Sequence, residues 1–218
     1  MDSRRILADI ASTRQELAVA RFTDTSGTNL PQGGNWGCNA TGTPRGAYTL
    51  QVVDGRPVMH VLRQERAAVA DLGPSEVSCL RAFGGGGLDV SRFRELHVRA
   101  KLKISGQSIS LCGVEASECP LMIEIIYENE KGVEQPWWYQ GFYAIELPGF
   151  PVNRTTCASC ISEHIRINAD NWYTFESSDL LELPENYQPT RIKQIKFYVS
   201  GHAYEVFIGE VSLYGETG

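Results

Sequence analysis

The sequence contains no long apolar run. No stretch of about 18 apolar residues, the length that crosses a bilayer as a helix, occurs in the chain. Residues 1–9 also lack the apolar core of a secretory signal peptide. We therefore expect no membrane-spanning segment in this chain. We expect either a cytosolic protein or a mature or excised domain whose targeting segment lies upstream.

Positive charge is also in short supply. The chain has 20 Lys and Arg residues against 26 Asp and Glu residues, a formal net charge of −6. This balance argues against nucleic acid and against an anionic membrane surface as main partners. The densest basic run falls largely on one strand face, and we interpret it as solvated surface: Arg92, Arg94, Arg99, Lys101 and Lys103.

Recognisable catalytic motifs are missing as well. The 4 histidines have no serine or cysteine in a nucleophile motif. Gly84–Gly87 lacks the Lys-Ser/Thr ending of a phosphate-binding loop, so we interpret it as a flexible turn. Glu124 and Glu128 share a strand face, but such carboxylate pairs arise by chance among 26 acidic residues. We expect a protein that is not an enzyme.

One segment near the N-terminus predicts a helix. Ile6, Leu7, Ile10 and Leu17 recur at helical spacing within residues 3–20, and β-branched residues are few there. The helix would either cover a sheet edge or form the end of a stalk. The expected organisation is therefore an N-terminal helix or stalk end at 1–21 and a single β-sandwich domain at 22–218.

The clearest strand pattern lies at residues 96–104. Apolar side chains occupy the even positions from Leu96 to Ile104, and histidine or basic side chains occupy the odd positions from His97 to Lys103. Strict alternation predicts a strand with one buried and one solvated face, as in an antiparallel sheet.

Turn signals organise the other strands. Asp54-Gly55, between residues 47–53 and 56–63, predicts a hairpin. The apolar register of the last strand slips at Gly209-Glu210, which predicts a β-bulge. Residues 23–46 are expected to form a long loop. Many short strands after a single helix indicate an all-β sandwich or barrel. Further strands are predicted at 121–127, 137–145, 192–199 and 204–214.

Six cysteines form an even set, and four of them stand in two close pairs. Paired cysteines in loop-like surroundings favour an oxidising compartment, and hence a secreted or surface-exposed domain. The Cys-x2-Cys pair fits a tight disulfide, a redox pair or half of a metal site, and the absence of a βαβ pattern disfavours the redox pair. Disulfides are expected at Cys38, Cys79, Cys112, Cys119, Cys157 and Cys160.

Structural zinc is the alternative for four of these cysteines. Four thiolates that include a Cys-x2-Cys pair hold tetrahedral zinc if their two loops meet. The Cys-x6-Cys spacing is long for a zinc knuckle, and His164 would compete as a fifth ligand, so we favour disulfides. The zinc ligands would be Cys112, Cys119, Cys157 and Cys160.

The order of these features resembles the galactose-binding-like jelly rolls found among carbohydrate-binding modules. Within it, residues 108–214 are similar to uncharacterised ectodomains, some attached to FecR-type surface proteins of Chloroflexi-like bacteria. The resemblance rests on an ordered set of short motifs, each weak alone: Cys119-Pro120-Leu121-Met122, Gly141-Phe142-Tyr143, Cys157-x2-Cys160-x3-His164, Asn171-Trp172-Tyr173-x-Phe175-Glu176-Ser177 and Phe197-Tyr198-Val199-Ser200-Gly201-His202.

The resemblance implies a jelly-roll β-sandwich exported to the cell surface, and it carries no known activity. Galactose-binding-like domains often hold one Ca²⁺ ion near their first and last strands. Asp24, Thr25 and Glu210 occupy the corresponding regions here, so a structural calcium site is expected at these residues. No dense run of Asp and Asn marks a loop site for the ion.

The aromatic segment 136–143 is the feature most suggestive of function. In a strand, Trp138 and Gln140 share one face while Trp137 and Tyr139 share the other. We expect one set to enter the core and the other to stay accessible, unless loops bury both. Exposed Trp and Tyr rings stack on the C–H faces of sugars, whose hydroxyls need polar partners. The candidate ligand-binding residues are Trp137, Trp138, Tyr139, Gln140, Arg166 and Asn171.

Two hypotheses on function follow from these features. The first is a non-catalytic module that binds a carbohydrate, such as a polysaccharide, or another cell-surface ligand on the aromatic strand. The second is a structural or protein-interaction ectodomain whose aromatic residues belong to the core. Both place the domain outside the cell, and the sequence names neither the ligand nor the oligomeric state.

Overall fold

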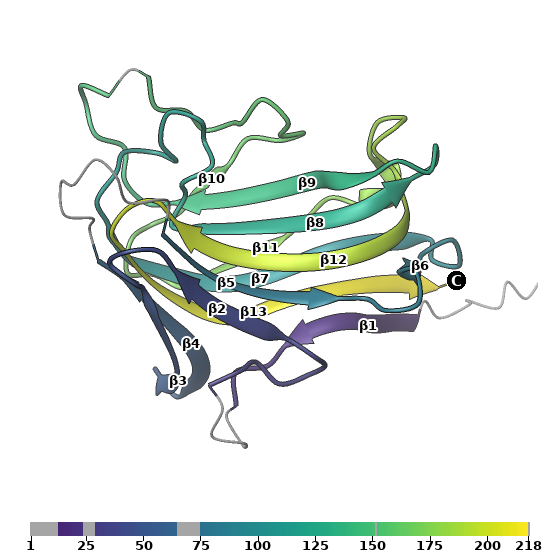
Figure 1. Cartoon of the computed structure of the whole chain (residues 1–218), viewed down its shortest axis with the longest axis horizontal. Helices are drawn as coiled ribbons and strands as arrows, with labels where there is room; N and C mark the ends of the chain where they lie inside the picture. Colours follow the sequence, from purple (N-terminus) through teal and green to yellow (C-terminus); the bar gives the residue numbers. More distant parts are fainter. Residues whose placement is uncertain (1–12, 24–28, 65–74, 151, 218) are drawn as a thin grey trace, which may run out of the picture.

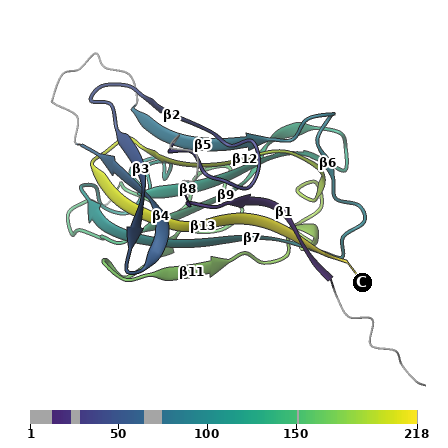
Figure 2. The same cartoon turned by 90° about the horizontal axis from the view of Figure 1, so that it is seen from below.

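The computed structural model describes residues 13–23, 29–64, 75–150 and 152–217. These residues form two β-sheets packed face to face, which Figure 1 views from the front and Figure 2 from below. The fold is an all-β jelly-roll sandwich, as predicted. Among the residues described, no helix is long and apolar enough to cross a membrane.

The front sheet, named for its position in Figure 1, has seven strands. Their order is β10-β9-β8-β12-β5-β2, with β6 beside β12. β10 and β9 run parallel, and the other pairs are antiparallel. The strands are β2 (Gly37–Thr41), β5 (Glu76–Ala82), β6 (Leu88–Asp89), β8 (Leu121–Asn129), β9 (Glu134–Tyr143), β10 (Ile165–Arg166) and β12 (Pro189–Ser200).

The back sheet has six antiparallel strands in the order β11-β7-β13-β4-β3, with β1 also paired to β13. A short 3₁₀ helix, η1 (Leu180–Glu182), follows β11. The strands are β1 (Thr13–Ala20), β3 (Ala47–Val53), β4 (Arg56–Arg63), β7 (Glu95–Gln107), β11 (Tyr173–Glu176) and β13 (Tyr204–Thr217).

The hydrophobic core lies between the two sheets and follows from the alternation of each strand. The apolar side chains of β7 from Leu96 to Ile104 are at most 1% exposed. They meet inward residues of β8 and β12, such as Ile123 and Ile195, which are fully buried. Each aliphatic side chain buried in this way contributes about 1.5–3 kcal/mol. The predicted polar face of β7 is thereby turned outward on the back sheet.

Both predicted turns are confirmed. Asp54 and Gly55 have φ angles of 52° and 72° and join β3 to β4, in the manner of the tight hairpin turns that need positive φ. The ladder of β13 with β7 shifts register between Ile208 and Glu210, at the predicted bulge. In the described part of the expected long loop at 23–46, residues 37–41 form strand β2, which pairs with β5.

The predicted N-terminal helix is wrong over the residues that the structure describes, because Thr13–Ala20 is strand β1 of the back sheet. Residues 3–12 lie outside the described residues. The β1–β13 ladder shifts register between Glu16 and Ala18, so Leu17 and Ala18 are both buried. This shift breaks the alternation that marks a strand in sequence. Pairing with β13 also satisfies backbone groups at a sheet edge, which outweighs weak helix propensity.

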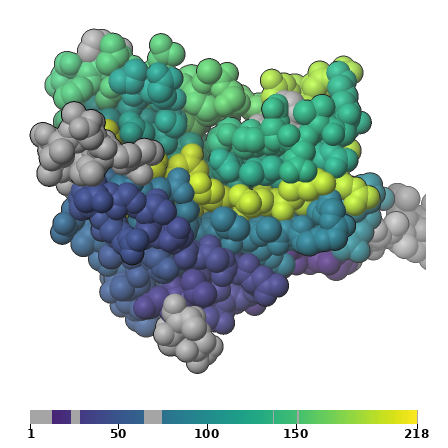
Figure 3. Space-filling view, viewed as in Figure 1, coloured from purple at the N-terminus to yellow at the C-terminus, as the bar shows by residue number. Residues whose placement is uncertain are grey.

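Loops cover one end of the outer face of the front sheet. In Figure 3, which looks onto that sheet, the green segment after β9 rises at the upper left. It lies against the loop between β7 and β8 through backbone hydrogen bonds between Cys112 and Arg154 and between Arg154 and Gly113. Beneath these loops is a second small core: Cys112, Ala116, Cys119, Met122, Tyr143 and Tyr198.

Candidate functional site

The aromatic strand β9 divides its side chains between the core and the outer face of the front sheet. Trp138, Gln140 and Phe142 are only 4%, 3% and 0% exposed. The ring of Trp138 lies 6.5 Å from that of Phe175 in the back sheet, between centroids. The side chain of Trp137 lies outside the described residues. The set that enters the core is therefore the one containing Trp138.

Tyr139 lies on the outer face, half-buried beside Glu124 of β8, which in turn pairs with Lys196 of β12. Burial and, secondarily, the Glu124 carboxylate raise the pKa of Tyr139 to about 12. Burial also raises the pKa of Glu124, against the opposing charge of Lys196 and with the repulsion of Glu76. Tyr139 therefore presents a neutral phenol and part of a ring to solvent, on a face whose charges neutralise one another.

The predicted polar partners are dispersed between the two sheets. The Gln140 side-chain amide donates to the backbone carbonyls of Gly141 and Glu163, at 3.0 and 3.3 Å. The exposed guanidinium of Arg166, at the β10 edge of the front sheet, donates to Glu146 at 3.0 Å. The exposed Asn171 lies beside β11 at the edge of the back sheet. The structure does not bring these three side chains together around the aromatic strand.

The cysteine prediction is confirmed, since the six cysteines form three disulfides. Cys38 and Cys79 occupy directly paired positions of β2 and β5, so one bond joins neighbouring strands of the front sheet. The other two bonds lie in the loops over that sheet. They join Cys112 to Cys119 and Cys157 to Cys160.

The alternative prediction, zinc held by Cys112, Cys119, Cys157 and Cys160, is wrong because disulfide sulfurs are not thiolates. Cys112, Cys119 and His164 do lie together, with ligand-type atoms within 4.8 Å of one another. His164, however, uses both ring nitrogens. Nδ1 accepts from the Gly141 backbone at 2.9 Å and Nε2 donates to the Ala116 carbonyl at 2.8 Å. Burial lowers the pKa of His164, which fits this neutral tautomer.

The predicted calcium residues are only partly described. Asp24 and Thr25 lie outside the described residues. Glu210 lies at the β13 bulge, where its carboxylate accepts a hydrogen bond from Ser212 at 2.9 Å and approaches Arg99 Nε at 3.8 Å. The surroundings of Glu210 are thus partly cationic, and calcium at this residue stays a prediction.

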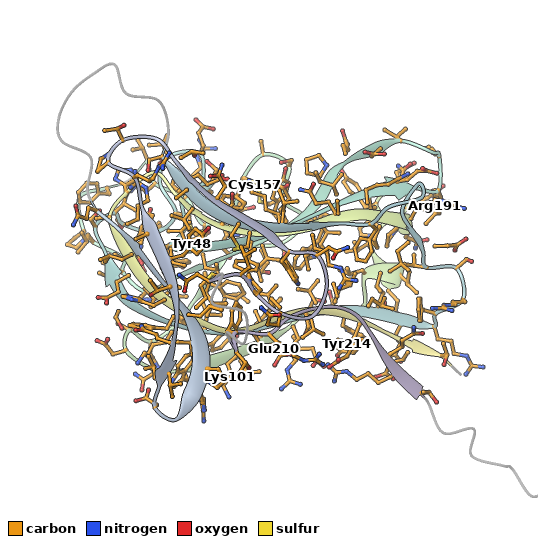
Figure 4. The ribbon with its side chains drawn as sticks, turned by 60° about the horizontal axis from the view of Figure 1, so that its bottom comes forward. Tyr48, Lys101, Cys157, Arg191, Glu210 and Tyr214 are labelled. Carbon is orange, nitrogen blue, oxygen red and sulfur yellow. A yellow bond between two sulfur atoms is a disulfide. The ribbon has the colours of Figure 1, made fainter. Side chains whose placement is uncertain are left out.

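An open groove lies at this bulge, on the outer face of the back sheet. Along β13, pairing with β4 ends at Ile208, and pairing with β1 starts at Val211. Gly209 and Glu210 therefore face a gap between the ends of two strands. In Figure 4, Lys101, Glu210 and Tyr214 lie together on this side of the sandwich, opposite Cys157 and Arg191.

The groove has a volume of about 490 Å³ and a mixed lining. Strand β7 lines it with Arg99 and Lys101, and the start of β4 with Arg56 and Pro57. Strand β1 and the residues just after it complete the lining. These residues are Arg14, Glu16, Val19, Ala20, Arg21, Phe22 and Thr23.

Two aromatic rings support the side chains at the groove. The Arg14 guanidinium lies 3.3 Å above the centre of the buried Tyr214 ring. Trp172 packs near Gly209, where an added Cβ would be 3.4 Å from the indole. Its Nε1 donates to Asp54 at 3.0 Å, and this bond is the main cause of the lowered pKa of Asp54. The β3–β4 turn is thereby tied to the edge of the groove.

The sequence analysis missed the groove, although two of its parts carried signals. The basic odd positions of β7 were interpreted as solvated surface, and two of them, Arg99 and Lys101, line the groove. The bulge at Gly209-Glu210 was predicted correctly. The part of the groove that the sequence did not predict is β1. A helix at these residues gives no reason to place Arg14 and Arg21 in one groove with the basic residues of β7.

Comparisons with known proteins find similarity among solved structures alone. No family model matches the chain, and no curated protein matches it. Among solved structures, it is similar to the family 11 carbohydrate-binding module of the cellulosomal cellulase Lic26A-Cel5E of Clostridium thermocellum. That match has 12% identity and a TM-score of 0.42, and it covers 94% of this chain and 95% of the other.

A second similar structure is the CBM22-1 xylan-binding domain from Paenibacillus barcinonensis Xyn10C. The identity is 11% and the TM-score 0.44, with 94% of this chain and 96% of that chain covered. At these identities and TM-scores, no binding residue is transferred to this chain.

Proposed function

We propose that this domain is a non-catalytic carbohydrate-binding module of an exported bacterial protein, and that it holds a polysaccharide or other cell-surface glycan in the groove of the back sheet. The observation that carries the proposal is the groove, about 490 Å³, open on a sheet face and lined by polar and apolar groups together. Small-molecule sites commonly measure about 300–1,000 Å³ and combine these two kinds of lining.

The lining matches the two surfaces of a sugar ring. Hydroxyl groups at the rim of a pyranose need hydrogen-bond donors and acceptors, while its C–H faces need apolar contact. Arg99, Lys101 and Glu210 supply the polar groups, and Val19 and Pro57 supply apolar surface. Guanidinium groups present several donors in a fixed fork, which suits neighbouring oxygens of one ring.

Most of these groups stand on paired strands, which limits the ordering cost of binding. Arg99 and Lys101 belong to β7, whose backbone is paired on both sides, to β11 and β13. The stack of Arg14 on Tyr214 fixes a further guanidinium. Groups held in place before the ligand arrives lose less conformational freedom on binding, so more of the interaction energy appears as affinity.

The two groove carboxylates favour binding rather than catalysis. Glu16 accepts from Arg21 at 2.8 Å, and Glu210 accepts from Ser212 at 2.9 Å. A glycosidase needs one carboxyl group that keeps a proton for the leaving oxygen and a second placed across the scissile bond. Both groove carboxylates instead accept hydrogen bonds from neighbouring side chains.

The disulfides support a location outside the cytosol. Three bonds in one domain are typical of secreted and cell-surface proteins, because cytosolic thiols are kept reduced. This supports an extracellular or cell-surface domain, in agreement with a role in glycan binding.

Affinity gel electrophoresis against a panel of soluble polysaccharides tests the proposal. The full chain should be retarded in at least one gel. The double variant Lys101→Ala with Arg56→Ala should lower the affinity for that polysaccharide by about tenfold or more, since a single strong polar contact already accounts for about that factor. Arg191→Ala on the front sheet is the matched control, because it removes a cation at similar exposure outside the groove. Retardation by no polysaccharide would contradict the proposal.

The same gels test the aromatic strand as the binding site. Tyr139→Ala removes the accessible ring that the structure describes on β9, and it should leave retardation unchanged. If Tyr139→Ala abolishes binding while Lys101→Ala with Arg56→Ala does not, the site belongs to the front sheet. Circular dichroism of every variant separates lost binding from lost folding.

A second candidate function, a protein-interaction ectodomain, is favoured by one observation. The loops over the front sheet expose large apolar side chains, with Val114 at 48%, Phe150 at 49% and Val152 at 59%. Single apolar residues on a surface are ordinary, but these belong to neighbouring loops. If they bind a second copy of the chain, sedimentation velocity should show a dimer that Phe150→Ser with Val152→Ser dissociates.

A further inference from the structure

The charge of the groove is opposite to that of the whole chain. Its lining contains five cationic side chains and two carboxylates, in a chain with a formal net charge of −6. We infer that the groove binds an acidic polysaccharide, one whose sugar rings carry carboxylate or sulfate groups. This inference rests on the proposed function and specifies its class of ligand.

The ion pairs within the groove leave much of this positive charge uncompensated. Arg21 and Glu16 pair at 2.8 Å, and both side chains are 58% exposed. Arg99 Nε is 3.8 Å from Glu210, too far for a hydrogen bond. This buried Nε atom has no hydrogen-bond partner among the residues described. An unsatisfied buried donor on the wall of an open groove favours an acceptor supplied by a ligand.

Three more cations line the groove without any carboxylate at ion-pair distance in the described part of the chain: Arg14, Arg56 and Lys101. The Arg14 guanidinium lies over the face of the Tyr214 ring, 3.3 Å from its centre. A guanidinium stacked in this way keeps the N–H groups in its plane free for oxygen acceptors. Arg56 lies 5.7 Å from the Trp172 ring, and Asp54, the carboxylate whose pKa it helps to lower, is already bonded to Trp172 and Lys103.

The front sheet of the same molecule provides the contrast. Lys193 lies 3.1 Å from Glu128 and 3.6 Å from Glu134, and Lys196 lies 2.9 Å from Glu76. These two lysines are matched by carboxylates on neighbouring strands, as is usual on a solvated sheet surface. The groove departs from this pattern where the sheet is also hollowed, so its excess charge coincides with space for a ligand.

Carboxylate and sulfate groups share the chemistry that such a groove recognises. Both present two or more oxygens that share a negative charge and accept charge-assisted hydrogen bonds from Arg and Lys. Because the groove is open, these interactions are screened by salt over a distance of about 10 Å at 0.1 M ionic strength. Binding of an acidic glycan should therefore weaken as salt is raised, whereas binding of a neutral glycan through hydroxyl groups should not.

Affinity electrophoresis and titration calorimetry of the full chain test the inference with five polymers. Alginate carries carboxylates and carrageenan carries sulfates, while xylan-derived oligosaccharides without acid groups and mixed-linked β-glucan are neutral. Polyglutamate is anionic without sugar rings. We expect alginate or carrageenan to bind at least about tenfold more tightly than the neutral polymers and polyglutamate. Raising NaCl from about 50 mM to about 500 mM should remove most of this preference.

Charge-removing variants place the preference in the groove. Arg99→Gln with Lys101→Gln should weaken binding of the acidic glycan about tenfold or more, by loss of charge-assisted contacts. Arg191→Gln is the matched control and should change affinity less than about twofold, because its exposed ion pair with Asp89 is remote from the groove. Lys101→Arg keeps the charge and should retain binding.

The outcomes separate failure of the inference from failure of the proposed function. Equal or tighter binding of a neutral glycan that the groove variants weaken would overturn the acidic class and leave the carbohydrate-binding function standing. Equal binding of polyglutamate would overturn the inference, since the groove would then recognise charge without sugar. Binding of no polymer would overturn both.

Discussion

The two outer faces of the sandwich differ in how far they are covered and in how their charges are balanced. On the front sheet, loops and disulfides cover one end, and Lys193 and Lys196 are paired with carboxylates. On the back sheet, a gap between β1 and β4 leaves a groove whose lining carries more cations than carboxylates. The outer face of the front sheet is therefore partly covered by loops, while the outer face of the back sheet keeps an accessible groove.

The aromatic strand and the groove also differ in where their side chains lie. β9 has the richest aromatic pattern in the sequence, but Trp138 and Phe142 fill the core and Tyr143 lies under loops. The groove has few exposed rings and owes its character to strands distant in sequence.

Trp138→Ala should produce the largest loss of stability. Removing a ring that is 4% exposed leaves a cavity between the sheets, and such changes cost about 3–5 kcal/mol. Tyr139→Ala, one position away on the outer face, is the control and should cost less than half as much. Urea unfolding followed by fluorescence measures both, and equal losses would show that the two faces of β9 are packed alike.

Removal of the Cys112–Cys119 disulfide should destabilise the front face and spare the groove. Cys112→Ala with Cys119→Ala should lower the free energy of unfolding by about 2.5 kcal/mol, from the entropy of opening its short loop. Hydrogen exchange should rise in the loops over the front sheet, while glycan binding stays unchanged. A groove that loses binding in this variant would show that the two faces are coupled.

The pH dependence of stability should have opposite signs on the two faces. Burial lowers the pKa of His164 under the front loops, so the unfolded chain takes up its proton first as pH falls. His164 does not change the free energy of unfolding above a pH of about 6.5. Below that pH, it lowers the free energy of unfolding by at most about 1.4 kcal/mol per pH unit. Thermal unfolding from acid to neutral pH should show this loss, and His164→Gln should flatten it.

His97 on the back sheet gives the contrary slope. Burial lowers its pKa, but the Ser177 carbonyl and the Glu95 carboxylate raise it more, so the net pKa is raised. Protonated His97 stabilises the fold fully below the pKa that His97 has in the unfolded chain. This stabilisation is lost as pH rises through the pKa of His97 in the folded chain. His97→Gln should remove this loss on the alkaline side, and a variant that instead changes the acidic limb would reverse the assignment.

The groove cations should have the smallest effect on stability. Arg99→Gln with Lys101→Gln removes half-buried charges with little compensation, so the free energy of unfolding should change by less than about 1 kcal/mol. The same variant should strongly weaken glycan binding. A large loss of stability measured by urea unfolding would show that these side chains serve the fold rather than a ligand.

Much of the fold could be predicted from local pattern. The alternation of β7, the Asp54-Gly55 hairpin and the slip at Gly209-Glu210 each appear in the structure as expected. These signals depend on neighbouring residues alone. The helix predicted over residues 3–20 is wrong over Thr13–Ala20, where the register shift beside Leu17 breaks the alternation that would have marked a strand.

The candidate site could not be predicted in the same way. Arg14, Arg56 and Arg99 lie on three strands that are distant in sequence, and they meet only because β13 changes its neighbour at the bulge. In sequence, each is an ordinary surface arginine. The excess of positive charge in the groove is a property of their arrangement and is invisible in a composition that is acidic overall.

Local sequence pattern was enough to predict that strands form, where several of them turn and which face of β7 is buried. Alternation and turn residues act over only a few positions, so they can be recognised without the rest of the chain. The sequence also indicated an oxidising environment through its paired cysteines. Tertiary structure alone decided which face of β9 entered the core and where β1 was placed. It also decided that scattered cations would share one groove, because these outcomes depend on strand pairing across the whole chain.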